Sequence, residues 1–205
     1  MQPLKCAGAE TIRLLKGFPA AIKHEVEEVV NILPLNHRVF LAGSQAHDID
    51  ISLQSPTQSV TLNGEQLEIP FRIYFNEPPR GKESSLSDLQ RTILNCVYSR
   101  HHDGFVRQKR LEQLIESTEP FVIPYTFQLL GEYIIEILVV LDRHVNNKTL
   151  NDYARFICDN KRYSQQIESR MISYWNEYYR HKFPDLKSYI GMNIFDKIKN
   201  HKIIP

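Results

Sequence analysis

The chain has 205 residues, enough for one large domain or two small ones that pack together. Its 25 basic and 24 acidic side chains leave a formal net charge of +1, which excludes an attraction of the whole molecule to nucleic acid or to an anionic membrane. The three cysteines, Cys6, Cys96 and Cys158, are widely separated and odd in number, so we expect a cytoplasmic protein without a disulfide framework, metal or cofactor.

The first part of the chain has the periodicity of helix. Residues 10–33 place apolar side chains near helical spacing, and Pro19 starts or kinks the second piece. The N-terminal stretch at 1–17, "MQPLKCAGAETIRLLKG", lacks the uninterrupted apolar run of a secretory signal. The pattern therefore predicts one or two amphipathic helices.

From His37 the apolar residues alternate over short runs, as in β-strands. The runs are "RVFLAG", "HDIDISL" and "SVTLNGEQLEIPFRIYF". Asn63 and Gly64 both tolerate the positive φ of a type I′ turn, so they predict a hairpin that pairs "SVTL" with "EQLEI". Pro70 cannot donate to a strand ladder and indicates an edge or a bend. We expect a small antiparallel sheet over roughly residues 37–76.

After a polar linker at 76–85, the remaining pattern is helical. Ser87 with Gln90 forms a capping box before a first helix, and Thr149 with Asp152 has the same spacing before a later one. Between them we expect helices over 105–117 and 121–145, and two more follow toward the end of the chain.

The longest apolar run, "YIIEILVVL", is interrupted by Glu136 and is shorter than the ~20 residues of a membrane span, so we expect a buried helix and no membrane partner. The predicted fold class is α+β. An N-terminal helix and a small antiparallel β-sheet occupy residues 1–80, and an α-helical bundle or HEAT-like stack occupies 86–205. The two parts could also form one continuous domain.

Basic residues concentrate in "SRHHDGFVRQKR", at 99–110. We expect a corner between two helices, with Asp103 as the cap of the second. The basic side chains would point outward and form a docking surface for an acidic protein partner of unknown identity. These partner-binding candidates are Arg100, Arg107, Lys109 and Arg110.

The same stretch could form a helix-turn-helix in which Arg107, Lys109 and Arg110 face phosphates. The balanced net charge and the interleaved Glu112 and Glu116 argue against this alternative. We therefore expect nucleic-acid binding to be weak and nonspecific. The adjacent histidines, His101 and His102, could not easily meet one metal ion from a regular helix, and we expect no metal site there.

The pattern Asp103, Val106, Arg107, Leu111 and Leu114 resembles the second-helix signature of HEAT-type repeats. The resemblance extends loosely over residues 86–145, and the following "FVIPYTFQLLGEYIIEIL" looks like the next stacked layer. It implies that the Asp and the Arg link one helical pair to its neighbours. The chain departs from the family pattern at Arg110, where a small Ala is usual. The string is also similar to segments of bacterial proteins, a resemblance that implies no activity.

A second constellation is "LAGSQAHDIDISL", which resembles the nucleotidyltransferase superfamily. The resemblance implies that Gly43 and Ser44 hold a triphosphate and that Asp48 and Asp50 hold magnesium. The chain departs from the family because only three residues, 45–47, separate the two parts, where members usually have a longer helical segment. A strand-turn-strand hairpin explains the same letters, with the aspartates alternating outward.

Glu132 and Glu136 are four residues apart in the helix predicted over 121–145. Their like charges would repel without cations nearby, so we expect them to form structural ion pairs with Arg100, Arg107 or Arg143. The aromatic string "YWNEYY" at 174–179 predicts core and interface contacts.

No nucleophile motif, metal set or phosphate loop is complete, so no catalytic residue is assigned. The sequence favours a non-catalytic protein-interaction module, with a nucleotidyltransferase-like enzyme and a helix-turn-helix protein as alternatives.

Overall fold

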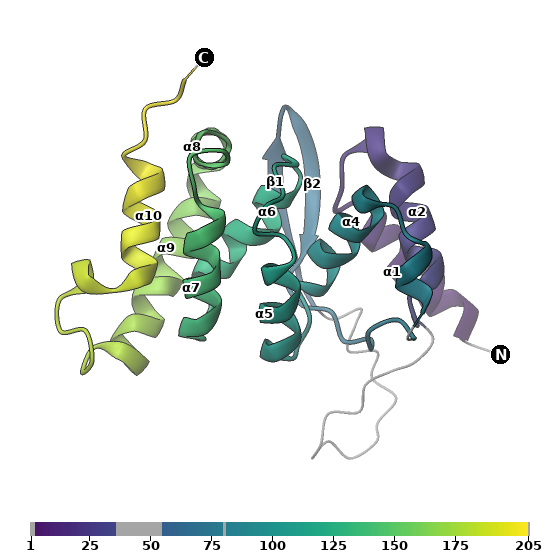
Figure 1. The fold of residues 1–205 in the computed structure, drawn as a ribbon, viewed down its shortest axis with the longest axis horizontal. Helices are drawn as coiled ribbons and strands as arrows, with labels where there is room; N and C mark the ends of the chain where they lie inside the picture. The colour runs from purple at the N-terminus through teal and green to yellow at the C-terminus, as the bar shows by residue number, and fades with distance from the viewer. Residues whose placement is uncertain (1–2, 36–54, 80, 205) are drawn as a thin grey trace.

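Helices dominate the architecture, and one β-hairpin lies among them (Figure 1). The computed structural model describes residues 3–35, 55–79 and 81–204. The elements in chain order are α1 (Pro3–Leu15), α2 (Lys23–Ile32), β1 (Thr57–Leu62), β2 (Glu65–Pro70), α4 (Asp88–Tyr98), α5 (Gly104–Glu112), α6 (Val122–Phe127), α7 (Ile135–His144), α8 (Leu150–Asp159), α9 (Lys161–Tyr174) and α10 (Ile190–Lys199). Short 3₁₀ turns are η1 (Ala20–Ile22), η2 (Lys82–Ser85), η3 (Gln128–Gly131) and η5 (Leu186–Ser188), and a π-helical turn, η4 (Trp175–Tyr179), extends α9.

The predicted α+β class with a helical bundle is confirmed. In Figure 1, α1, α2 and α4 lie at one end, α10 lies at the other, and the hairpin lies between them. One hydrophobic core runs through the described residues and takes side chains from all of these parts, among them Leu14, Val60, Leu67, Leu138 and Ile194.

The N-terminal pair of helices is confirmed, and it breaks at Pro19 as expected. The break lies against the helical bundle, because the Tyr125 hydroxyl of α6 donates to the carbonyl of Gly17 at 3.0 Å. A Cβ at Gly17 would lie 2.5 Å from that hydroxyl oxygen, so the close approach requires glycine. Phe18 stacks on the same Tyr125 ring at 5.0 Å between centroids.

The hairpin is also confirmed. β1 and β2 pair antiparallel from Leu62 with Glu65 to Thr57 with Pro70. Asn63 and Gly64 have φ values of 51° and 84°, as a type I′ turn requires. β2 ends at Pro70, which agrees with its missing backbone donor. The other two strands expected from the sequence, at 38–43 and 47–53, lie outside the described residues.

Beyond β2 the chain continues extended and pairs with the corner between α4 and α5. Ile73 donates its N–H to the carbonyl of Arg100 at 2.9 Å, and its own carbonyl accepts from the N–H of His102 at 3.0 Å. This parallel bridge joins the segment after β2, which we call the hairpin arm, to the corner between α4 and α5.

The continuous helix expected over 121–145 is wrong. α6 ends at Phe127, η3 follows, and Glu132 has an extended ψ of 151° before α7 begins at Ile135. At the break the Glu132 carboxylate turns to Arg72 and Arg107 in the interior, and the preceding Gly131 packs against Arg170 on α9. Glu132 and Glu136 therefore do not share one helix face.

The two expected capping boxes have different outcomes. Ser87 and Gln90 form both reciprocal hydrogen bonds at the start of α4, as predicted. Thr149 does not cap α8 with its side chain, so that expectation is wrong. Its hydroxyl instead donates to the carbonyl of His144 at the end of α7 and fastens the turn between the two helices.

His144 begins a buried chain of polar side chains. Its Nδ1 lies 2.8 Å from the Tyr153 hydroxyl, which itself donates to the Thr126 hydroxyl at 2.6 Å. Because the Tyr153 proton is used on Thr126, we assign the donor in the first contact to the imidazole. Burial lowers the pKa of His144 to about 4, so the ring is neutral at physiological pH.

The folded protein should therefore lose stability in acid. The unfolded chain binds a proton at this histidine near pH 6.5, whereas the folded protein binds it only near pH 4. Between these values the free energy of unfolding should fall as the pH falls, by about 1.4 kcal/mol per pH unit for this one group. Guanidinium unfolding across that range measures the slope, and His144→Gln should reduce it.

His181→Gln is the matched control, because His181 is exposed. It should leave the slope unchanged. An equal slope in the wild type and in His144→Gln would show that His144 is not the group responsible.

Candidate functional site

The corner between α4 and α5 forms as the sequence predicts. Asp103 precedes α5, and its carboxylate accepts the N–H of Phe105 at 2.8 Å. Gly104 lies against Ile134, and a Cβ there would be 2.4 Å from Cδ1 of that side chain. The corner is thus packed directly on the segment that leads into α7.

The basic side chains of this corner do not form the expected outward surface. Arg100, Arg107 and Arg110 are 0%, 2% and 5% exposed, so the expectation that they point outward is wrong for these three. Lys109 is exposed, and its ammonium lies 3.3 Å from a carboxylate oxygen of Glu77. The reason is that each guanidinium finds carboxylate or carbonyl acceptors inside the protein, which removes the penalty for burying it.

The two histidines of the corner both have lowered pKa values. Their rings lie 4.2 Å apart between centroids. Burial, assisted by the neighbouring His102, lowers the pKa of His101 to about 4. Burial also lowers the pKa of His102.

Arg110 on α5 binds two carboxylates of the polar linker at 76–85. Its guanidinium bonds to Glu77, to Glu83 at 2.7 Å and to the side chain of Asn95 at 3.2 Å. It also lies over the Tyr98 ring, 5.2 Å from the centroid. Although burial raises it, the pKa of Glu77 is lowered overall by Arg110 and Lys109. A large cation at the position where HEAT-type repeats carry Ala therefore has a local structural role.

Glu132 is the centre of a buried ion cluster. Its side chain is 2% exposed, and its carboxylate oxygens lie 2.6 Å from Arg72, 3.6 Å from Arg100 and 3.1 Å from Arg107. The predicted pairing of Glu132 with Arg100 and Arg107 is confirmed. Glu136 is exposed and has no ion pair among the described residues.

Sequence reasoning missed Arg72. It lies sixty residues before Glu132, in the extended segment after β2, where no helical spacing connects the two. The only signal in the sequence was indirect: a buried carboxylate needs cationic partners, and the chain offers many.

The three arginines also bind backbone carbonyls. Arg107 donates to His101 at 2.7 Å and to His102 at 2.9 Å. Arg100 donates to the carbonyls of Tyr125 and Phe71, both at 3.3 Å. The cluster, which we call the Glu132 cluster, thereby connects the hairpin arm, the α4–α5 corner, α6 and the start of α7.

The charge of the Glu132 cluster is not balanced. Three guanidiniums face one carboxylate, and burial together with the charge of Arg72 lowers the pKa of Arg100 to about 9 despite the attraction of Glu132. The cluster contains no nucleophile, and the described part of the chain holds no group of three or more His, Cys, Asp or Glu residues suited to a metal ion. The Glu132 cluster therefore acts as a structural clamp: it joins separate segments of the chain, and its arginines outnumber its carboxylate.

An aromatic patch lies beside this clamp. Tyr133 directly follows Glu132, and its ring centroid is 5.8 Å from that of Tyr174 and 6.0 Å from that of Tyr178. Tyr133 and Tyr178 are 48% and 50% exposed, and Phe105, next to the Gly104 that touches Ile134, is 86% exposed. We call these four residues, Phe105, Tyr133, Tyr174 and Tyr178, the aromatic patch.

Hydrogen bonds hold the backbone of the patch in place at Tyr133. The Tyr179 hydroxyl donates to the carbonyl of Tyr133 at 2.6 Å and accepts from the N–H of Ile135 at 3.3 Å. Trp175 donates its indole N–H to the carbonyl of Phe183 at 2.9 Å and packs inward. The string "YWNEYY" thus supplies both packed and exposed rings.

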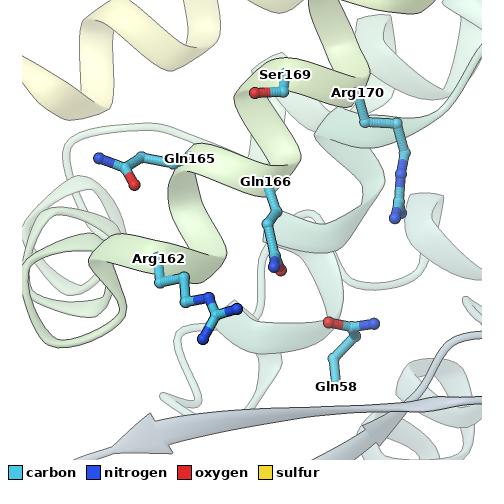
Figure 2. A pocket seen from close by; sticks show the side chains of 6 residues that line it. All are labelled: Gln58, Arg162, Gln165, Gln166, Ser169 and Arg170. Carbon is cyan, nitrogen blue, oxygen red and sulfur yellow. The ribbon is translucent and has the colours of Figure 1, made fainter.

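A polar groove opens on another part of the surface, between β1 and α9 (Figure 2). Its volume is about 580 Å³, and its lining consists of Gln58, Arg162, Gln165, Gln166, Ser169 and Arg170. Asn160 holds α9 against β1 there, because its side-chain amide accepts from the N–H of Thr61 and donates to the carbonyl of Thr61, each at 2.7 Å. The groove has cationic and neutral donors and no carboxylate among its lining side chains.

Gly43, Ser44, Asp48 and Asp50, the residues of the nucleotidyltransferase resemblance, lie outside the described residues. Within the described ranges, no helix combines the length and the apolar character that crossing a membrane needs. Comparison of the chain with protein-family models, curated proteins and solved structures gives no significant match.

Removing the charge of Glu132 should strongly destabilise the protein. Glu132→Gln keeps the size of the side chain and leaves two buried guanidiniums, Arg100 and Arg107, and the partly buried Arg72 without a counter-ion, so the free energy of unfolding should fall by about 3–5 kcal/mol. Urea unfolding at neutral pH measures the loss.

Glu136→Gln is the matched control. Its carboxylate is exposed, and the change should stay within about 0.5 kcal/mol. Equal midpoints for the wild type and Glu132→Gln would contradict the role assigned to the cluster.

Proposed function

We propose that the chain is a non-catalytic protein-interaction module whose docking surface is the aromatic patch. The observation that carries the proposal is the contact between two half-exposed tyrosine rings, Tyr133 and Tyr178, together with the exposure of Phe105, at 86%, on the helix whose Gly104 lies against Ile134. Aromatic side chains are enriched at protein–protein interfaces and dominate their binding energy. Exposed aromatic side chains grouped in this way favour a docking surface over a fully solvated face.

Charge around the patch favours a basic partner segment. Asp103, Glu136 and Glu177 are exposed, and none of them forms an ion pair within the described ranges. Asp103 lies two residues before Phe105, and Glu177 lies between Tyr174 and Tyr178.

The cations that follow this segment, Arg180 and Lys182, do not pair with these carboxylates. Arg180 donates to the side chain of Asn176, and the ammonium of Lys182 lies over the Phe183 ring. We therefore propose a Lys- or Arg-containing segment of a protein partner as the occupant, in place of the acidic partner expected from the sequence. Such side chains can combine cation–π contacts with the tyrosines and ion pairs with the acidic rim.

Preorganisation also supports a docking role. The Glu132 cluster fixes the residue before Tyr133, and Tyr179 fixes the carbonyl of Tyr133 itself. A backbone held in this way loses little conformational freedom when a partner binds.

The finer sequence expectations belong to the same proposal. In a HEAT-like stack, Arg107 of α5 would link one helical pair to the next, and its contact with Glu132 ahead of α7 supports that role. A cytoplasmic location, expected from the cysteines, is retained as part of the proposal. The helix-turn-helix alternative gains no support, because two of its three phosphate contacts, Arg107 and Arg110, are buried.

Fluorescence anisotropy with labelled peptides tests the proposal. A short peptide of alternating Arg and Leu should bind saturably at physiological salt, whereas a matched peptide of alternating Glu and Leu should not. Phe105→Ala and Tyr178→Ala should each weaken binding by about tenfold, the loss of a truncated aromatic anchor.

Ile12→Ala is the matched control, because Ile12 is a 58% exposed apolar side chain on α1. It should bind the basic peptide like the wild type. Equal binding of the acidic and basic peptides, or full binding by both patch variants, would overturn the proposal.

A further inference from the structure

We infer that the polar groove between β1 and α9 binds a phosphate group carried by a small molecule. The inference is independent of the proposed docking surface, because the groove and the aromatic patch share no residue. It uses side chains to which the sequence alone gave no role.

The groove presents polar groups that the protein itself leaves unused. Figure 2 shows Arg162 and Gln166 of α9 reaching toward Gln58 of β1, with Arg170 apart from them further along α9. Within the described part of the chain, none of the lining side chains forms a hydrogen bond or an ion pair. Guanidinium, amide and hydroxyl groups are the donors that recognise phosphate oxygens.

Arg170 connects the groove to the Glu132 cluster. Its guanidinium lies 4.8 Å from the centroid of the Phe71 ring, and that of Arg72 lies 4.9 Å from the same centroid. Arg72 in turn contacts Glu132, where the guanidiniums outnumber the carboxylate.

The arginines of the groove and those of the cluster therefore lie close enough for both to contribute to the positive potential at the groove. No carboxylate lines the groove to cancel it. A site with this excess attracts an anion. A tetrahedral oxyanion can accept from Arg162 and from the amides of Gln58 and Gln166, and Arg170, about two turns further along α9, adds positive charge.

The lining indicates more than a free ion. The groove is open to solvent, and a single phosphate would contact only a part of its polar lining. The amides of Gln58 and Gln166 and the hydroxyl of Ser169 can hydrogen-bond the polar remainder of an ester. A phosphate monoester of a polar small molecule, such as a nucleoside monophosphate, has this chemistry.

Isothermal titration calorimetry tests the site with three probes: adenosine monophosphate, inorganic phosphate and chloride at matched ionic strength. Both phosphates should bind and chloride should not. The nucleotide should bind more tightly than inorganic phosphate, and equal binding would overturn the inference that a small molecule carries the phosphate. Arg162→Gln should weaken phosphate binding about tenfold, because Arg162 is exposed and its loss removes one charge-assisted contact.

Lys161→Gln is the matched control. Lys161 is the neighbouring exposed cation on α9, but it does not line the groove, so its loss should weaken binding by less than about twofold. Gln166→Glu places a carboxylate in the groove and should abolish binding. An equal effect of Lys161→Gln and Arg162→Gln would show that general surface charge attracts the phosphate, and it would overturn the inference. It would also be overturned by the absence of phosphate binding, or by a single-stranded oligonucleotide that binds more tightly than the nucleotide.

Discussion

The carboxylate of Glu132, buried among Arg72, Arg100 and Arg107, is the interaction on which the rest of the structure depends. Burying an ion pair is costly, and it succeeds only where hydrogen bonds satisfy the remaining donors. Here Arg100 and Arg107 each donate to two backbone carbonyls in addition to facing the carboxylate. Because those carbonyls belong to the arm after β2, the α4–α5 corner and α6, one acidic side chain sets the relative positions of segments that are far apart in the chain.

The same cluster connects the two surfaces to which functions are proposed. On one side it fixes the backbone ahead of Tyr133, and so it holds one ring of the aromatic patch in place. On the other side its surplus positive charge extends through Arg72 and the Phe71 ring to Arg170 in the polar groove. A protein partner at the patch and a small phosphorylated molecule at the groove would therefore both bind next to one rigid centre. Rigid elements position such sites better than loops do.

The local features of the chain could be predicted because neighbouring residues decide them. Asn63 and Gly64 form the turn that their tolerance of positive φ indicated, and Ser87 with Gln90 forms the expected capping box. Asp103 caps α5 for the same reason: its carboxylate needs to reach only the N–H of Phe105, two residues away. The failures came where packing overrides local preference. The helix expected over 121–145 breaks where Glu132 becomes extended and turns to the arginines in the interior. Thr149 bonds to His144 instead of capping α8.

By itself the sequence determined the fold class, the hairpin and the starts of α4 and α5, and it indicated that Glu132 needs an arginine, with Arg100 and Arg107 among the candidates, since charge balance and short-range geometry govern these features. Only the tertiary structure decided that Arg100, Arg107 and Arg110 lie inside, because burial of a guanidinium depends on acceptors supplied from elsewhere in the chain, such as Glu77 for Arg110. It also brought Arg72 to Glu132, sixty residues away, and left Arg162 beside Gln58 with no partner in the described ranges. No periodicity encodes such contacts, because they arise when separate elements pack together and their side chains meet in space.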